Sequence, residues 1–446
     1  MAISKKTKSK LLLWKLSFIT LGLFFTINIP KVRVLYPGNR SSLLRPLARG
    51  SNISHICSPD RFPIHGLKVG SFPPLFDAVV VEDLERNTSV GLFFTMAATN
   101  FSQVVSLGPL FCEFDTKEVT RIKEPVRERY NLALILLCPV PELARKNLER
   151  NFSITMRFAD ESRNNVSPFF HACWSVQANY FVPGSHLSKK KVGACLLLQD
   201  KNQFIDEWIA YHNLLGIERV YIYLNEIRDD SLLQFRNYFE QDIVLPIKWP
   251  FLSPNRLPFS RMQSVQINDC LWRFRHLHDW LVFMDVDEFL QPMGNVSLKG
   301  FVNYLRFMES KEDIGGLCVH NVFFGMAPSH KYNPDSLVIE QAVYRQENVT
   351  TTRPKTIARP TNVYYMWVHV PSIGRKCIYP DPDKEVRLVH YKNVDTKPPK
   401  WYPEMKVLDN SMQCIASKVK EQLKRQPSVW NSVRYQNSIG EFRNGQ

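Results

Sequence analysis

From Lys191 onward, short unbroken apolar runs alternate with stretches whose apolar residues recur at helical spacing. The run at residues 194–198 predicts a buried strand. The next stretch predicts a helix, because its apolar positions recur every three or four residues: Phe204, Ile205, Trp208, Ile209 and Leu215. Gly216 is placed to end this helix as a C-terminal cap, and residues 219–224 predict a second strand. A strand, a helix and a strand in this order make a βαβ unit.

A second round of the same pattern follows. Residues 232–239 predict a helix, 243–247 a strand and 263–277 a further helix, before a strand that leads into Asp285. Alternating strands and helices predict an α/β fold with a Rossmann-like parallel sheet. In the last strand, the apolar residues 281–284 run without a break into three carboxylates: Asp285, Asp287 and Glu288. Such a run is typical of a central strand that is covered on both faces.

Two of these carboxylates form the first candidate site. We expect Asp285 and Asp287 to point to the same side at the carboxyl end of the strand, about 6.6 Å apart at the rise of a strand. Open α/β sheets bind their ligands at this edge. Two like charges beside an apolar core repel each other, which favours a cation between them. Two structural alternatives remain open: an acidic surface turn, and pairing of the carboxylates with an arginine such as Arg273.

The N-terminal residues predict a membrane anchor. Four lysines among residues 1–10 precede an apolar segment at residues 11–29. Only Lys15 interrupts this segment, and its long side chain can reach the headgroups. No small-x-small cleavage site follows. Residues 1–10 are therefore expected to be a cytoplasmic tail and 11–29 an uncleaved transmembrane signal anchor. A cleaved signal peptide is the competing interpretation.

The chain between the anchor and Lys191 has two parts. Residues 30–70 are rich in Pro, Ser, Arg and Gly without periodicity and predict a stem. Residues 71–190 contain short apolar runs separated by polar turns, which predict a β-rich accessory region, with a sandwich as one form it can take. These runs are at residues 78–81, 91–96, 132–137 and 152–156.

Composition narrows the class of protein. With 446 residues, 44% of them hydrophobic, the chain is long enough for two domains besides the anchor. No nucleic-acid-binding motif accompanies the formal net charge of +15, so we expect no nucleic-acid partner; anionic donors, glycans and membranes suit a basic surface equally. All eight Asn-x-Ser/Thr sequons follow the anchor, and the nine cysteines include no Cys-x-x-Cys pair. These features favour a lumenal glycoprotein with some disulfides, at least one unpaired thiol and no zinc site.

Three segments resemble a known family. Residues 207–217, which read Glu-Trp-Ile-Ala-Tyr-His-Asn-Leu-Leu-Gly-Ile, resemble the "EW-x-x-YH-x-x-LG" segment of glycosyltransferase family 92, and residues 266–273 and 285–289 resemble later blocks of that family. The resemblance extends over residues 191–402. It implies a GT-A catalytic domain at residues 191–446 and an inverting, Mn²⁺-aided transfer of galactose from UDP-galactose to a glycan or glycoprotein. Together with the predicted anchor, it also implies a single-pass type II protein of the Golgi membrane.

The same resemblance implies roles for individual residues. Asp285, Asp287 and His390 would hold the metal, and Glu288 would support the site or touch the sugar. His390 opens a segment that is similar to the "H-F-x-G-x-x-K-P-W" segment of other GT-A enzymes, in which the lysine, here Lys397, meets the diphosphate. His369 is the alternative imidazole. The donor contacts that the resemblance implies are Lys201, Asn202, Asn225, Gln266, Asp269 and Asp285.

Inversion also requires a base that takes a proton from the acceptor hydroxyl. We expect a carboxylate downstream of the metal strand, and the candidates are Asp313 and Glu340. Two other functions remain open. Gln203 and Leu224 stand near the expected uridine site where the family often carries acidic residues, which leaves room for an inactive glycan-binding relative. A haloacid-dehalogenase-type phosphatase also places Asp-x-Asp after an apolar strand, but that chemistry expects Thr or Val at the position of Phe289.

Overall fold

The computed structural model describes much of the chain after residue 66. The described residues are 67–69, 72–83, 88–96, 109–122, 126–127, 133–151, 153–164, 166–174, 189–198, 202–224, 235–249, 259–294, 296–311, 313–327, 330–392, 394 and 405–425. The predicted tail and anchor, and all of the predicted stem except residues 67–69, lie outside them. Within the described residues, no helix has the length and apolar character needed to cross a membrane.

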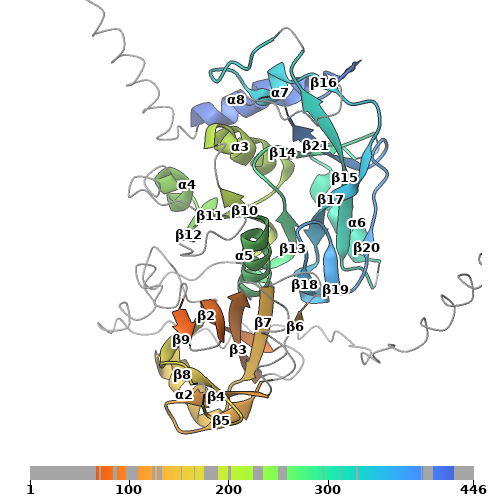
Figure 1. Ribbon diagram of the computed structural model, residues 1–446. Coiled ribbons are helices and arrows are strands. Elements are labelled where there is room, and N and C mark those ends of the chain that lie inside the picture. The colour runs from red at the N-terminus through yellow and green to blue at the C-terminus, as the bar shows by residue number, and fades with distance from the viewer. Residues whose placement is uncertain are drawn as a thin grey trace, which may run out of the picture. The chain divides into compact units, whose positions relative to one another are not determined.

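The β-rich region forms one nine-stranded sheet in the order β5-β4-β8-β9-β2-β3-β7-β6, with β1 paired to β2 and with α2 (Glu142–Asn151) following β7 in the chain (Figure 1). Hydrogen bonding joins all its described strands into a single sheet. The sheet folds back on itself, because the Cys112–Cys138 disulfide joins β4 to β7, which are five strands apart in this order. The strands are β1 (Leu67–Val69), β2 (Phe72–Asp83), β3 (Thr88–Met96), β4 (Leu110–Phe114), β5 (Val119–Arg121), β6 (Val126–Arg127), β7 (Ala133–Pro139), β8 (Ser153–Asp160) and β9 (Phe170–Trp174).

Four parallel strands form the first half of the second sheet, in the order β12-β11-β10-β13. They are β10 (Lys190–Leu198), β11 (Arg219–Leu224), β12 (Val244–Lys248) and β13 (His278–Phe283). Numbered by their order in the chain, the four strands lie side by side as 3-2-1-4, which is the arrangement of a Rossmann half-sheet. The predicted α/β class with a Rossmann-like parallel sheet is therefore confirmed.

The second sheet continues with strands of mixed direction. β13 pairs with β17, β17 with β15, β15 with β21, and β21 with β14. In the described residues, β14 pairs with no strand other than β21. The strands are β14 (Glu288–Pro292), β15 (Gly316–Gly325), β16 (Tyr344–Arg345), β17 (Thr350–Ala358), β20 (Cys377–Ile378), β21 (Val386–Tyr391) and β22 (Val407–Leu408), with β18 (Val363–Met366) and β19 (Pro371–Gly374) as a separate hairpin.

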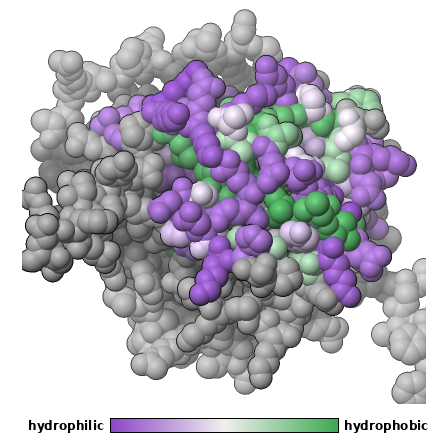
Figure 2. All heavy atoms as spheres, turned by 90° about the horizontal axis from the view of Figure 1, so that it is seen from above, coloured by the Kyte–Doolittle hydropathy of each residue, from purple (hydrophilic) through white to green (hydrophobic). Residues whose placement is uncertain are grey.

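Helices accompany the second sheet. They are α3 (Ile205–Leu215), α4 (Arg236–Glu240), α5 (Phe259–Phe274), α6 (Phe301–Glu309), α7 (Val338–Gln341) and α8 (Ala416–Arg425), with 3₁₀ turns at Asn202–Phe204, Pro360–Asn362 and Gln413–Ile415. Gly216 ends α3 as predicted, at a left-handed φ of 100° that suits glycine. The face seen from above is mostly hydrophilic, with smaller hydrophobic areas between the polar side chains (Figure 2).

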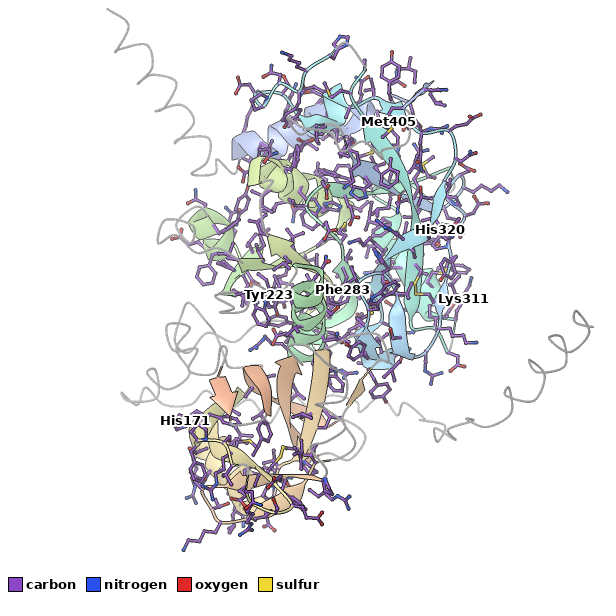
Figure 3. The ribbon with its side chains drawn as sticks, viewed as in Figure 1. His171, Tyr223, Phe283, Lys311, His320 and Met405 are labelled. Carbon is purple, nitrogen blue, oxygen red and sulfur yellow. A yellow bond between two sulfur atoms is a disulfide. The ribbon has the colours of Figure 1, made fainter. Side chains whose placement is uncertain are left out.

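The side chains of β10 alternate between two cores. Its even-numbered residues from 192 to 198 pack in one core with the apolar face of α3. Cys195 and Leu197 point to the opposite face and pack in a second core with α5. Tyr223 of β11 and Phe283 of β13 belong to this second core (Figure 3). Both faces of the parallel sheet are thus covered, which is why its strands appear in the sequence as unbroken apolar runs.

Disulfides join distant parts of the described chain, as the sequence predicts. The three bonds are Cys112–Cys138, Cys195–Cys270 and Cys318–Cys377. Cys414 is an exposed free thiol. Cys57 and the side chain of Cys173 lie outside the described residues. The second bond ties β10 to α5, so the sheet and the helix next to the site are covalently linked.

Candidate active site

The Asp-x-Asp residues lie in a turn rather than in a strand. β13 ends at Phe283, and β14 begins at Glu288. The Glu288 N–H donates to the Asp285 carbonyl at 3.1 Å and closes the turn between them. The prediction that the strand extends through Asp285 and Asp287 is therefore wrong. Because the chain turns here, the two carboxylates contact different positive side chains.

Asp285 is held by two residues from neighbouring elements. Its Oδ2 lies 2.8 Å from the Lys355 ammonium of β17, and its Oδ1 accepts a hydrogen bond from the Gln263 side chain of α5 at 2.9 Å. Burial raises the pKa of Asp285, but the charge and hydrogen bond of Lys355, together with the charge of His390, give a net downward shift. Asp285 is therefore an ionised carboxylate whose two oxygens already have partners.

Glu288 contacts several other members of the acidic cluster, which consists of Asp285, Asp287, Glu288, Lys355, His390 and Lys392. Its side chain is only 1% exposed and accepts a hydrogen bond from the Asp285 N–H at 2.7 Å. The same carboxylate lies 3.3 Å from the Lys355 ammonium and, through Oε1, 3.3 Å from His390 Nδ1. Burial raises the pKa of Glu288 above its ordinary value. Of the two roles expected for Glu288, its contacts favour support of the site.

Asp287 faces β21. The Tyr391 N–H donates to the Asp287 carbonyl at 2.9 Å and ties the turn to the end of that strand. Asp287 Oδ2 lies 3.3 Å from His390 Nε2 and 3.2 Å from the Lys392 ammonium. His390 and Lys392 are two residues apart at the end of an extended segment, so they share a face and both reach the same carboxylate. The structure thus brings together Asp287 and His390, which the sequence placed in one site.

Asp287 and His390 fit a divalent cation better than Asp285 does. His390 Nδ1 lies 3.3 Å from Glu288 Oε1, and Nε2 lies 3.3 Å from Asp287 Oδ2. With its proton on Nδ1, the ring would present the lone pair of Nε2 beside Asp287 Oδ2, and a cation could bind both atoms. A carboxylate behind a ligating imidazole is the usual support of a metal site. Within the described residues, no group of three or more His, Cys, Asp or Glu side chains is arranged to hold a metal. The chain would therefore supply two ligands, and a bound donor or water would supply the others.

The expected donor contacts are distributed unevenly. Lys201, Asn225, Lys397 and the side chain of Asn202 lie outside the described residues. Gln266 is 1% exposed, and its side-chain nitrogen has no hydrogen-bond partner among the residues that the structure describes. A buried polar group without a partner is uncommon, so Gln266 remains a candidate for a donor contact.

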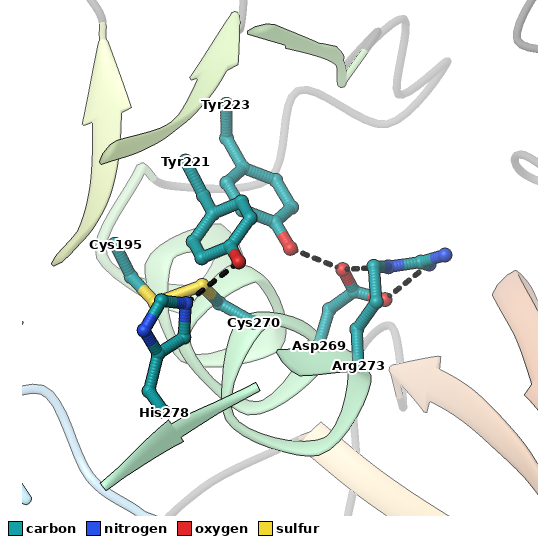
Figure 4. The surroundings of a disulfide bond; sticks show 7 residues. All are labelled: Cys195, Tyr221, Tyr223, Asp269, Cys270, Arg273 and His278. Atoms are coloured by element: carbon teal, nitrogen blue, oxygen red, sulfur yellow. Dashed lines mark hydrogen bonds and ion pairs between the residues drawn. A yellow bond between two sulfur atoms is a disulfide. The ribbon is translucent and has the colours of Figure 1, made fainter. Parts of the chain in front are cut away.

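Asp269, in contrast, is used in a buried ion pair. Arg273 donates to both of its carboxylate oxygens, at 3.0 and 2.8 Å, and the Tyr223 hydroxyl donates to one of them at 2.5 Å (Figure 4). Both partners of the ion pair have fully buried side chains. We therefore leave Asp269 out of the proposed donor site. The same pairing uses Arg273, which is consequently not the partner of Asp285 or Asp287.

The structure does not bring the two base candidates to the cluster. Asp313 lies in the turn before β15, with a φ of 80°, and pairs with Arg375. Glu340 lies on α7 and pairs with Lys420 of α8 at 2.6 Å. The alternative imidazole has a different environment: His369 Nδ1 lies 3.2 Å from the Pro354 carbonyl, and the ring interacts electrostatically with Lys355 and Asp285.

Two residues of the cluster were missed by sequence reasoning. Lys355 lies in β17, 70 residues from Asp285, and no local pattern marks it. Lys392 is two positions after His390, and the alternation of side chains in a strand would have placed it on the same face. Both are lysines that carry positive charge into a cluster of three carboxylates, so together they offset most of its negative charge.

A carboxylate and imidazole cluster at the carboxyl edge of a Rossmann-type sheet defines an α/β protein that binds its ligand at that edge. The family follows from comparison with known sequences: the chain belongs to glycosyltransferase family 92, whose family model matches residues 190–429, just over half of the chain. This agrees with the resemblance found in residues 207–217, 266–273 and 285–289.

Individual relatives are more distant. A glycosyltransferase family 92 protein of Arabidopsis thaliana is 29% identical over 279 residues, which cover 56% of this chain and 43% of the relative. One from Oryza sativa subsp. japonica is 31% identical over 125 residues, or 28% of this chain and 19% of the relative. A galactan beta-1,4-galactosyltransferase of A. thaliana is 26% identical over 201 residues, or 42% and 38%. The chain spans less than half the length of these relatives.

Proposed function

We propose that this protein is a metal-dependent glycosyltransferase with a GT-A catalytic domain. It transfers a hexose, galactose from UDP-galactose, to a hydroxyl of a glycan or glycoprotein with inversion. The observation that carries the proposal is the convergence of Asp287 and His390 at the edge of the sheet in a family 92 chain. Similarity to two galactan beta-1,4-galactosyltransferases supports galactose as the sugar. The proposal includes anchoring in the Golgi membrane through residues 11–29, with the catalytic domain in the lumen.

The cluster gives each side chain a distinct task. Asp287 and His390 would hold Mn²⁺, which when bound would neutralise the diphosphate as it leaves. Glu288 holds the His390 ring by its Nδ1, so that Nε2 faces the ligand. Lys355 holds Asp285, and Lys392 adds positive charge next to Asp287.

Two further residues complete the proposed donor site. Lys397 follows five residues after Lys392 in the sequence and adds a second positive charge for the diphosphate. The unpaired side-chain nitrogen of Gln266 is a hydrogen-bond donor for an oxygen of the sugar nucleotide.

The test is donor-dependent release of UDP by the full chain. A set of UDP-sugars is combined with a set of glycan acceptors, each with Mn²⁺ or with EDTA. We expect release to be fastest with UDP-galactose, to require an acceptor and to stop in EDTA. The matched control is Asp287→Asn, which removes one charge from the cluster with little change in shape.

Other outcomes identify the alternatives. Binding of UDP and a glycan without release would indicate an inactive glycan-binding relative. Hydrolysis of a phosphomonoester without binding of UDP would indicate a phosphatase. Transfer at full rate in EDTA would contradict the metal but not the transferase.

A further inference from the structure

Three aromatic side chains of α3 lie next to β14, the strand that follows the Asp-x-Asp turn. Trp208, Tyr211 and His212 are spaced i, i+3 and i+4, which places them on one face of the helix. All three are buried, at 0%, 1% and 0% exposure. They form a single surface against Phe289 of β14, with Tyr211 and His212 ring centroids 5.3 and 5.4 Å from that of Phe289.

The polar atoms of these side chains contact the outer edge of β14. The Trp208 indole N–H donates to the Glu288 carbonyl at 2.8 Å. The Tyr211 hydroxyl donates to the Leu290 carbonyl at 2.7 Å, and His212 Nε2 accepts from the Leu290 N–H at 3.3 Å. Two donors thus face two carbonyls, and one acceptor faces one N–H. The residue types match the backbone groups that each side chain meets.

These contacts complete the hydrogen bonding of an edge strand. In an antiparallel pair, alternate residues direct their N–H and C=O groups away from the partner strand. In β14 these residues are Glu288 and Leu290, because Asp287 is bonded to β21 through Tyr391. The Glu288 N–H is used in the turn with Asp285, and α3 takes the other three groups. Each buried backbone group left unpaired would cost free energy. The hydrogen bonds from α3 therefore stabilise β14 in the position seen in the structure.

His212 can act here only in one protonation state. Its Nδ1 lies 2.8 Å from the Trp208 carbonyl, one turn earlier in α3, and must donate its proton there. Nε2 is then the acceptor that the Leu290 N–H requires. Asn or Gln could also accept at this point, whereas Lys or Arg could not.

We propose that Trp208, Tyr211 and His212 are positioning residues, which hold β14 from its outer side so that Asp287 and Glu288 meet His390. β21 fixes only one edge of this five-residue strand. Short strands held on one edge open easily, so the second set of contacts sets how often the carboxylates are in place. The expected effect on Mn²⁺ and UDP binding rests on the proposed function. The expected effect on the position of β14 does not.

Two conservative variants test the proposal in the full chain. Trp208→Phe removes the indole N–H, and Tyr211→Phe removes only one hydroxyl. The matched control is Trp272→Phe, because the Trp272 indole N–H also donates to a backbone carbonyl, that of Tyr364, at 3.0 Å and away from the cluster. Each protein is titrated with Mn²⁺ in the presence of UDP.

We expect each α3 variant to need about five times more Mn²⁺ for half-maximal UDP binding, the equivalent of one hydrogen bond of about 1 kcal/mol. The control should keep the wild-type value even if it melts at a lower temperature. In a Glu288→Gln background, Trp208→Phe should raise the Mn²⁺ requirement by a smaller factor. Both changes act on the same series of contacts, from Trp208 through Glu288 to His390. Variants that lose stability like the control but bind Mn²⁺ and UDP like wild type would overturn the proposal.

Hydrogen exchange separates this inference from the proposed function. Amide protons of residues 288–291 should exchange about five times faster in both α3 variants than in wild type and the control, by the same loss of one hydrogen bond. Wild type that binds no UDP would refute the proposed function, and exchange alone would then decide. Unchanged exchange at residues 288–291 in both variants would overturn the positioning role.

Discussion

The Lys355 ammonium lies 2.8 Å from Asp285 Oδ2, with the lysine side chain only 6% exposed. The same ammonium also reaches Glu288 at 3.3 Å. β17 brings this lysine to the site by pairing with β13, whose end leads into the Asp-x-Asp turn. A permanent cation therefore already neutralises part of the acidic cluster. This permits the carboxylates to gather at the edge of the core without a bound metal.

The first prediction is that Lys355→Met destabilises the protein strongly. The change leaves the buried Glu288 and the partly exposed Asp285 without their counter-charge, and breaking a buried ion pair typically costs about 3–5 kcal/mol. Urea unfolding in EDTA measures the effect. The matched control is Lys191→Met, since Lys191 also bridges two carboxylates, Asp279 and Glu309, but with 23% exposure. Equal losses in the two variants would show that Lys355 has no special role in the cluster.

The parallel half of the second sheet could be predicted because its signals are local. Strands covered on both faces leave unbroken apolar runs, and α3 leaves apolar residues at helical spacing, ended by Gly216. The ends of strands leave weaker signals. Four apolar residues before Asp285 suggested that the strand continues through the aspartates, whereas the structure turns after Phe283. Hydrophobicity marks what is buried, not where the backbone changes direction.

The candidate site, too, could be predicted only in part from the sequence. His390 could be paired with Asp287 because both carry side chains typical of metal sites in recognisable segments. The partners of Asp285 could not, because Lys355 is 70 residues away and approaches through the pairing of β13 with β17. The positions of the base candidates could not be predicted for a related reason. Carboxylates such as Asp313 lie in turns, where periodicity gives no information on which end of the sheet they occupy.

The second prediction concerns acid. Burial lowers the pKa of His212 from 6.5 to about 3. An unfolded chain binds a proton at this residue below pH 6.5 and the folded chain only near pH 3, so the stability present above pH 6.5 is lost as the pH falls. Between pH 7 and pH 5 this amounts to about 2 kcal/mol. Glu207 opposes it, because burial raises its pKa to about 7 and favours the folded state as the pH falls through that window.

The two contributions are of similar size, so the test is the difference between proteins: on going from pH 7 to pH 5, the melting temperature of His212→Gln should change less unfavourably than that of wild type. Gln keeps an acceptor for the Leu290 N–H but does not titrate. His171→Gln is the control, since His171 is exposed. A wild-type protein whose melting temperature falls no more steeply than that of His212→Gln would contradict the buried neutral imidazole.

The third prediction compares two histidines. His390→Ala should raise the Mn²⁺ concentration needed for UDP binding by at least about tenfold, since loss of a ligand or its support commonly costs that much. His369→Ala should matter less, because His369 contacts the Pro354 carbonyl and not Asp287. Titration of both variants with Mn²⁺ at fixed UDP gives the order. The reverse order would mean that the wrong imidazole has been assigned to the metal.

The last prediction is that Asp287→Asn abolishes metal-dependent binding at little cost in stability. Asn keeps the shape of Asp287 and can still accept from Lys392, whose side chain is 13% exposed and can regain water. Removing one of three clustered carboxylates also relieves their mutual repulsion. Thermal melts in EDTA should therefore shift little, whereas the rise in melting temperature with Mn²⁺ and UDP should vanish. Asp409→Asn is the structural control: Asp409 pairs with Arg345 and Arg387 through contacts of 2.9 and 2.8 Å. That variant should melt lower in EDTA and keep the full rise with Mn²⁺ and UDP, because its carboxylate supports the fold and not the ligand. If Asp287→Asn behaves like Asp409→Asn, then Asp287 is a structural ion-pair residue and the metal assignment is wrong.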